Sequence, residues 1–188
     1  MSLRFAVKEF VLNALAQWEF KRGIHGLDGS PQKWRARHLR LMRVEHGKHF
    51  TIGCDIHIRN RGSLVLGERC GIGSFARIWN YAPITLGDDF LAAGGLTLNS
   101  ATHDPLTLAP EGKPIRIGHR VWCGVNVTIL AGVTIGDDVV IGAGSVVTSD
   151  ISSNCIAVGV PAKKLKDLGR DDKTKMWQWA NTGDAPSK

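Results

Sequence analysis

An aliphatic residue returns at every sixth position between Leu66 and Ser152, and a glycine often follows it directly. The clearest pairs are Leu66-Gly67, Ile72-Gly73, Ile117-Gly118, Ile135-Gly136 and Ile141-Gly142. Self-similarity at a fixed period is typical of a solenoid, in which each repeat stacks on the one before it. A β-sandwich would show irregularly spaced strands, and a βαβ fold would show helical stretches between strands. Neither pattern is present, so the repeat predicts an all-β solenoid.

The repeat falls into blocks of 18 residues, with two-residue steps before Leu66, Leu86 and Ile117. Three hexads per turn predict a triangular coil whose leading and fifth residues point inward. A single coil cannot bury its own core, so the coils must stack. The glycine after the leading residue is expected at a tight bend, where a Cβ atom would be costly. The fifth residues are Cys70, Ala76, Ala82, Leu96, Val121, Val127, Val133, Val139 and Ser145.

Helical spacing appears only outside the repeat. Residues 3–20 carry apolar side chains at i, i+3 and i+4 positions, which predicts an amphipathic helix. A second helix is expected at about 32–43 and a short one at about 173–179. The predicted organisation is therefore an N-terminal basic helical segment over 1–49, a β-helix over 50–166 and a C-terminal helix and tail over 167–188.

The net charge of +7 is concentrated near the N-terminus, because residues 1–49 contain ten Lys or Arg and four Asp or Glu. No nucleic-acid motif accompanies this charge, so a nucleic-acid partner is not expected. A solvated helix face and peripheral contact of residues 1–43 with a membrane or a lipid-linked glycan both stay open. The chain lacks a run long enough to span a bilayer and lacks a signal-peptide pattern, so a cytoplasmic location is expected, including the inner face of the membrane.

The four cysteines do not predict a metal site. Cys54, Cys70, Cys123 and Cys155 are scattered without a C-x-x-C pair, which favours small buried side chains in a reducing compartment. Cys123 leads a hexad and is expected to point inward, which argues against a cysteine acyl-enzyme.

The repeat is interrupted once at length, after His103. Residues 104–116 are expected to form an extruded loop, and such loops often form the binding face of a solenoid. A histidine at the base of this loop can take a proton from a hydroxyl at cellular pH. Asp104 either orients the imidazole or caps a turn. Trp122 is the sixth residue of its hexad and is expected to face outward.

The repeat, Trp122, the Ala143-Gly144-Ser145 turn and the Gly159-Val160-Pro161-Ala162-Lys163 exit occur in order. In this the chain resembles the hexapeptide-repeat acyltransferases, in particular the maltose and galactoside O-acetyltransferase group and its polysaccharide-biosynthesis relatives. The resemblance covers about residues 50–165. It implies a left-handed parallel β-helix, a homotrimer with active sites between neighbouring subunits, and acetyl-CoA as cosubstrate without a catalytic metal.

The same resemblance assigns roles to individual residues. His103 becomes the general base, and Trp122 lies beside the active-site groove. Small residues at Gly124 and Ala143 would line a groove for the pantetheine arm. The positions that match acetyl-CoA contacts are Val125, Ala143, Thr148 and Ser149, and the positions that match phosphate contacts are Lys163 and Lys166. For each lysine, a solvated surface charge stays open.

Two departures from the maltose and galactoside enzymes lie on the acceptor side. Gly73 falls where those enzymes carry Asn, and Asn80-Tyr81 falls where they carry Asp-Asp. Asn80 and Tyr81 are therefore candidate contacts to a different acceptor, with a plain surface role as the alternative. We expect O-acetylation of a sugar hydroxyl in surface polysaccharide biosynthesis. An antibiotic or nucleotide-amino-sugar N-acetyltransferase is the alternative, while a γ-type carbonic anhydrase and a non-catalytic trimer are less favoured.

Overall fold

A computed structural model describes residues 44–171 apart from 48, 54, 61 and 62. The helices expected at 3–20, 32–43 and 173–179 lie outside the described residues. Within them the chain is all-β, with parallel strands stacked into a left-handed β-helix, as the repeat and the resemblance predict. No helix in this described part is both long and apolar enough to cross a membrane.

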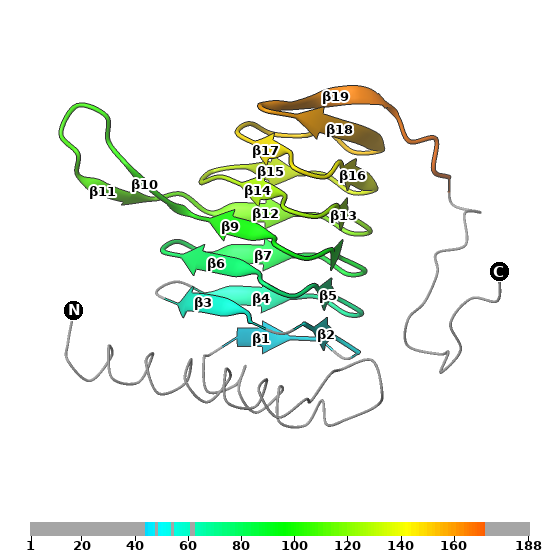
Figure 1. Ribbon diagram of the computed structural model, residues 1–188, viewed down its shortest axis with the longest axis horizontal. Helices are drawn as coiled ribbons and strands as arrows, with labels where there is room; N and C mark the ends of the chain where they lie inside the picture. The colour runs from blue at the N-terminus through cyan, green and yellow to red at the C-terminus, as the bar shows by residue number, and fades with distance from the viewer. Residues whose placement is uncertain (1–43, 48, 54, 61–62, 172–188) are drawn as a thin grey trace.

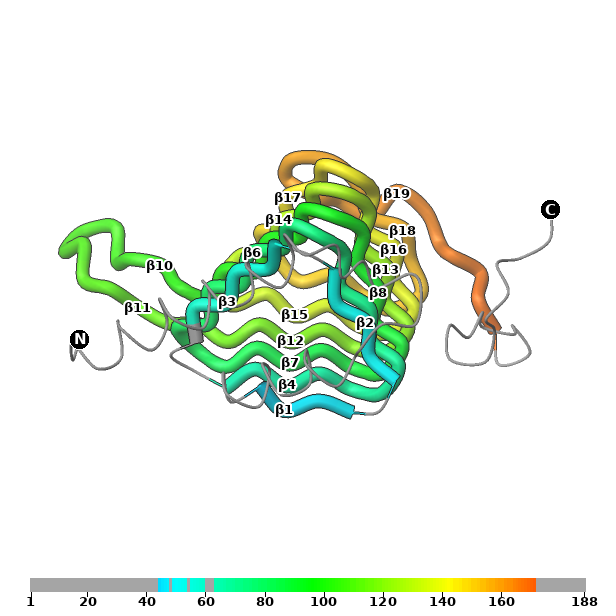
Figure 2. The backbone as a smooth tube through the Cα atoms, turned by 60° about the horizontal axis from the view of Figure 1, so that its bottom comes forward, coloured from blue at the N-terminus to red at the C-terminus, as the bar shows by residue number. Residues whose placement is uncertain are grey.

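Three sheets form the faces of a prism that Figure 2 shows nearly end on. The first face contains five strands: β1 (Val44–His46), β4 (Leu64–Leu66), β7 (Ile84–Leu86), β12 (Ile115–Ile117) and β15 (Thr134–Ile135). The second contains seven: β2 (Thr51–Ile52), β5 (Gly71–Ile72), β8 (Leu91–Ala92), β13 (Trp122–Cys123), β16 (Val139–Ile141), β18 (Cys155–Gly159) and β19 (Ala162–Asp167). The third contains five: β3 (His57–Asn60), β6 (Arg77–Asn80), β9 (Thr97–Asn99), β14 (Thr128–Ile129) and β17 (Val146–Val147).

The core confirms the inward direction of the leading and fifth residues. From Leu66 onward the leading residues are buried, and the apolar fifth residues lie beside them. Phe90, which is 0% exposed, fills the same core. Because each buried aliphatic side chain contributes about 1.5–3 kcal/mol relative to exposure, the stack of coils is held mainly by this column.

The glycine after the leading residue is explained by coil stacking rather than by the bend itself. A Cβ atom on Gly73 would lie 2.5 Å from the carbonyl carbon of Ala93 in the next coil. The residue in the left-handed backbone region comes two places later, as at Phe75 (φ 64°) and Asp138 (φ 56°). The predicted steric cost of a side chain is confirmed, but its source is the neighbouring coil.

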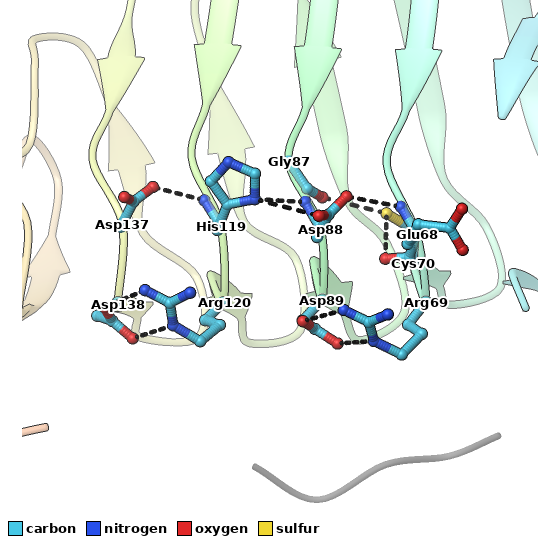
Figure 3. A network of polar contacts seen from close by, with 10 residues as sticks. All are labelled: Glu68, Arg69, Cys70, Gly87, Asp88, Asp89, His119, Arg120, Asp137 and Asp138. Carbon is cyan, nitrogen blue, oxygen red and sulfur yellow. Dashed lines mark hydrogen bonds and ion pairs between the residues drawn. The ribbon is translucent and has the colours of Figure 1, made fainter. Parts of the chain in front are cut away.

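Side chains at one corner link successive coils (Figure 3). The backbone N–H of Glu68 donates to Asp88 Oδ1 at 2.8 Å, and the N–H of Asp88 donates to His119 Nδ1 at 3.0 Å. The N–H of His119 in turn donates to Asp137 Oδ1 at 2.7 Å, and that of Asp137 to Ser153 Oγ at 3.0 Å. We call this series the corner ladder.

Arginine–aspartate pairs run beside the corner ladder. Arg69 binds Asp89 with two hydrogen bonds of 2.6 and 2.8 Å, and Arg120 binds Asp138 with two of 2.7 Å. Arg170 also donates to Asp138, at 3.0 Å, and so fastens the end of the described chain to the stack.

One hairpin leaves the prism. β10 (Ala101–His103) and β11 (Pro110–Gly112) pair in antiparallel fashion and project from the corner between the third and first faces (Figures 1 and 2). The hairpin contains most of the loop expected at 104–116, and its first strand begins before it. The chain re-enters the stack at β12.

Candidate active site

Ser100 anchors the hairpin where it leaves the stack. Its side chain is 0% exposed, and its Oγ accepts the N–H of Ala82 at 2.9 Å and lies 2.9 Å from the carbonyl of Ala82. Its backbone N–H donates to Trp79 O at 3.0 Å, and its carbonyl accepts the N–H of Lys113 at 2.9 Å. Both strands of the hairpin are therefore held at their bases by one buried residue.

His103 lies three residues beyond this anchor, at the end of β10. It pairs in register with Pro110 of β11, and its side chain is exposed. Among the described residues no group accepts or donates a hydrogen bond to the imidazole. The histidine is thus presented to the outside of the chain on a two-stranded support, where a bound hydroxyl can reach it.

Asp104 caps the turn of the hairpin. Its Oδ1 accepts hydrogen bonds from the N–H of Leu106 at 3.0 Å, the N–H of Thr107 at 2.7 Å and the hydroxyl of Thr107 at 2.8 Å. These bonds, first those from Thr107, hold the pKa of the Asp104 carboxyl below its usual range. Of the two roles left open by the sequence, the structure favours the cap, because this oxygen binds the loop rather than His103.

The two residues proposed to contact the acceptor, Asn80 and Tyr81, differ in exposure. Asn80 is 0% exposed at the end of β6, whereas Tyr81 is 38% exposed. A Cβ atom on Gly112 would lie 2.7 Å from Cδ1 of Tyr81, so the tyrosine ring packs against the base of β11. Tyr81 is therefore the member of the pair that can contact a ligand near the hairpin.

Trp122 faces outward as expected, with 51% of its surface exposed. It lies on β13 in the second face, paired with Leu91 of β8 and Val140 of β16. The hairpin leaves from a corner that does not border this face (Figure 2). A single chain therefore does not bring Trp122 and His103 together.

The small residues expected to line a groove lie at the corner between the second and third faces. Val125 is 50% exposed, and its carbonyl accepts the N–H of Gly144 from the next coil at 2.8 Å. Ala143 is also exposed. Gly124 is buried, and a Cβ atom there would lie 2.7 Å from the amide nitrogen of Ala143. Gly124 thus brings two coils close together beneath an exposed ridge, which we call the donor ridge, formed by Val125, Ala143 and Gly144.

The other expected cosubstrate residues lie in two places. Thr148 and Ser149 are exposed just after β17, before Ile151 bridges to β15, so they lie at the corner between the third and first faces and not at the donor ridge. Lys163 and Lys166 are exposed on β19. Lys163 pairs in register with Val158, whose side chain covers Gly142 beside the donor ridge. All four side chains can reach a ligand from outside the chain.

The buried thiols are inert at this site. Cys123 is 0% exposed, and burial raises the pKa of its thiol to about 12. Burial likewise raises the pKa of Cys70 to about 11. A thiol so rarely ionised is a poor nucleophile. Among the described residues no group of three His, Cys, Asp or Glu side chains could hold a metal ion.

Ser100 and Gly112 were not among the predicted site residues. Ser100 is the third residue of the hexad led by Leu98, a position for which the six-residue pattern predicts no inward side chain. Gly112 could not be assigned from sequence, because the ring that it accommodates belongs to Tyr81 in another coil.

Comparisons with known proteins find hexapeptide-repeat proteins and acetyltransferases. A family described as the hexapeptide repeat of succinyl-transferase matches residues 114–149. The chain is 32% identical over 153 residues to WbbJ of Escherichia coli K12, named as a lipopolysaccharide biosynthesis O-acetyl transferase; the match covers 73% of this chain and 77% of the relative.

Galactoside O-acetyltransferase of Escherichia coli K12 is 39% identical over 136 residues, covering 69% of this chain. The match spans 63% of that enzyme, less than two thirds of its length. Among solved structures, a galactoside acetyltransferase in complex with coenzyme A is similar with a TM-score of 0.57 and 26% identity, covering 95% of this chain and 89% of that one.

Proposed function

The chain belongs to the hexapeptide-repeat acetyltransferase family, and we propose that it transfers the acetyl group of acetyl-CoA to a sugar hydroxyl in surface polysaccharide biosynthesis. The observation that carries the proposal is the Ser100-anchored hairpin that presents His103 to the outside. The similarity to a lipopolysaccharide biosynthesis O-acetyl transferase supports the glycan acceptor.

His103 acts as the general base in a single-step transfer between two bound substrates. The imidazole takes the proton of the acceptor hydroxyl while the oxygen attacks the thioester carbonyl carbon. The resulting oxyanion is stabilised by fixed donors at the site, typically backbone N–H groups. The C–S bond then breaks, and the protonated imidazole returns the proton to the leaving sulfur, so that free coenzyme A and an O-acetyl sugar are formed.

The donor ridge and its neighbours hold the acetyl-CoA. Exposed small residues at Val125 and Ala143 leave room for the narrow pantetheine arm beside accessible backbone. Lys163 and Lys166 are cations that suit the phosphates of the nucleotide end. The relative solved with coenzyme A supports this cosubstrate, and the step needs no metal ion.

The complete site forms between subunits of a homotrimer. In one chain the hairpin with His103 and the face with Trp122 lie apart, and the donor ridge occupies a different corner from the hairpin. Two copies placed side by side can bring one copy's hairpin to the other copy's ridge. A cytoplasmic location stays a prediction, and so does contact of residues 1–43 with a membrane or a lipid-linked glycan, because those residues lie outside the described part.

The test is a thiol-release assay with acetyl-CoA across free sugars, nucleotide sugars and glycan fragments, followed by product analysis. The proposal expects acceptor-dependent release of coenzyme A and a product whose acetyl group is removed by mild alkali, as an ester is. An alkali-stable amide would indicate the N-acetyltransferase alternative. Absence of acceptor-dependent release across the glycan fragments would contradict the proposal.

A further inference from the structure

Four side chains form a compact surface on the outer side of the third face. His57 and Arg59 project from β3, and Arg77 and Trp79 from β6. His57 pairs in register with Arg77, and Arg59 with Trp79. Since adjacent strands lie about 4.8 Å apart and alternate residues about 6.6 Å apart, the four form a small rectangle. We call it the basic grid.

The basic grid is exposed, and no ion pair with a described acidic side chain neutralises its arginines. His57, Arg59 and Arg77 are exposed, and Trp79 is 41% exposed. None of the strands of the third face contains Asp or Glu. The nearest acid along the chain, Asp55, lies in the corner before β3.

Two other arginines of the coils have a structural role, because each is paired with an acidic side chain. Arg69 and Arg120 each bind an aspartate of the next coil through two hydrogen bonds. The corresponding neighbour of Arg77 in the next coil is Thr97, and that of Arg59 is Trp79. Among the described residues neither grid arginine has an ion-pair partner, so the grid offers planar guanidinium groups to an external anion.

The basic grid lies on the approach to His103. β3, β6 and β9 all end on the side of the stack from which the hairpin projects (Figure 1). Trp79 pairs with Asn99, and four residues further along the chain comes His103. Tyr81 follows β6 and packs on Gly112 at the hairpin base. A chain-like ligand lying on the grid therefore leads past Tyr81 toward the proposed base.

We propose that the basic grid binds an acidic glycan, so that the acceptor of the acetyl group carries carboxylate-bearing sugars. The inference rests on the proposed O-acetyltransferase function and adds the substrate class. The carboxylate is held by the guanidinium groups of Arg59 and Arg77 in charge-assisted hydrogen bonds. Trp79 supplies a flat apolar surface for a sugar ring, with a polar N–H at its edge.

A single-stranded nucleic acid also combines negative charge with rings that stack on aromatic side chains. The glycan is favoured because the grid has a single exposed tryptophan and leads directly to the hairpin. Binding of a single-stranded RNA is therefore measured as the alternative outcome.

The experiment measures binding of the full-length protein, with coenzyme A present, to three probes. These are an oligogalacturonide, the same oligosaccharide with its carboxyl groups reduced to alcohols, and a single-stranded oligouridine. We expect retention of the acidic oligosaccharide and at least about tenfold weaker binding of its reduced form, the size of one lost charge-assisted hydrogen bond. Arg59→Gln combined with Arg77→Gln should weaken acidic binding to a similar degree.

Arg116→Gln is the matched control, because Arg116 is an exposed arginine on β12 of the first face. It should leave binding of the acidic oligosaccharide unchanged. The inference is overturned by equal binding of the acidic and reduced probes, by binding of neither, by an undiminished double variant, or by tighter binding of the oligouridine. Acceptor-dependent acetyl transfer to neutral glycans alone would reject this inference and leave the proposed function standing, whereas absence of any transfer would reject the proposed function.

Discussion

Ser100 shows how one buried hydroxyl determines where the proposed base lies. Its Oγ is within 2.9 Å of both the N–H and the carbonyl of Ala82, and within 3.2 Å of Trp79 O. One hydroxyl proton can serve one of the two carbonyls at a time, while a lone pair serves the N–H. The hairpin is thereby fixed to the preceding coil rather than hanging from flexible chain.

Replacing Ser100 by alanine should therefore loosen the hairpin. Ser100→Ala leaves the buried N–H of Ala82 without this acceptor, which costs about 1–3 kcal/mol. Hydrogen exchange should become faster at the Ala82 amide and in 101–112, and urea unfolding should report the loss of stability. Ser152→Ala, at an exposed serine, is the control. Unchanged exchange of the Ala82 amide in Ser100→Ala would show that the hydroxyl does not anchor the hairpin.

The corner ladder joins each coil to the next through one side chain that accepts a backbone N–H. In His119 the acceptor is Nδ1, which receives the N–H of Asp88 at 3.0 Å. His119→Ala removes the acceptor, and the expected loss is about 0.5–1.5 kcal/mol of unfolding free energy. His119→Asn offers a side-chain oxygen in place of Nδ1 and should unfold close to the wild type. Chemical denaturation of both variants tests this, and equal destabilisation by Ala and Asn would argue against the ladder.

The arginine–aspartate pairs make the coil contacts sensitive to acid. Hydrogen bonding to Arg120, with a further bond from Arg170, lowers the pKa of Asp138, whose side chain is 18% exposed. The charged carboxylate is the favoured folded form, so this stabilisation is present above the ordinary aspartate pKa. It is lost as the pH falls from about 3.9 through the lower folded value.

The melting temperature of the wild type should thus drop as the pH is lowered from neutrality through this range. Asp138→Asn should have a lower melting temperature at neutral pH and a smaller further drop in acid. Asp55→Asn, at an exposed aspartate in another corner, is the control and should follow the wild type. Parallel acid profiles for wild type and Asp138→Asn would contradict the assignment.

The coils were largely predictable, because a six-residue period in apolar positions dictates which side chains face the core. Leu98 and Ile141 were placed inward from spacing alone, and both are 0% exposed. The corner ladder was not predictable, since the partner of His119 depends on which residues the stack brings into register. The separation of His103 from Trp122 depends on which face each strand joins. The six-residue spacing assigns strands to faces only after the residues that form the corners have been identified.

The parts of the proposed site occupy different corners of one prism. His103 projects from the corner between the third and first faces, while Ala143 lies at the corner between the second and third. Activity should therefore require two copies of the chain.

Complementation between inactive variants tests that requirement. His103→Ala removes the proposed base, and Ala143→Trp fills the donor ridge with a bulky ring, so each variant alone should be inactive. Co-expressed variants should recover part of the wild-type activity, because some interfaces then combine an intact hairpin with an intact ridge. Purified homo-oligomers mixed without subunit exchange provide the control. Failure of co-expressed variants to exceed the sum of their separate activities would indicate a site within one chain.

If His103 is the general base of acetyl transfer, its loss must slow turnover, so kcat of His103→Ala is the decisive measurement. The measurement uses the acceptor identified by thiol release, with assembly and coenzyme A binding checked in parallel. We expect kcat to fall by about 10²–10⁴-fold, the usual contribution of a positioned base, while KM for acetyl-CoA and the oligomeric state stay unchanged. A kcat equal to that of the wild type would show that His103 is not the general base.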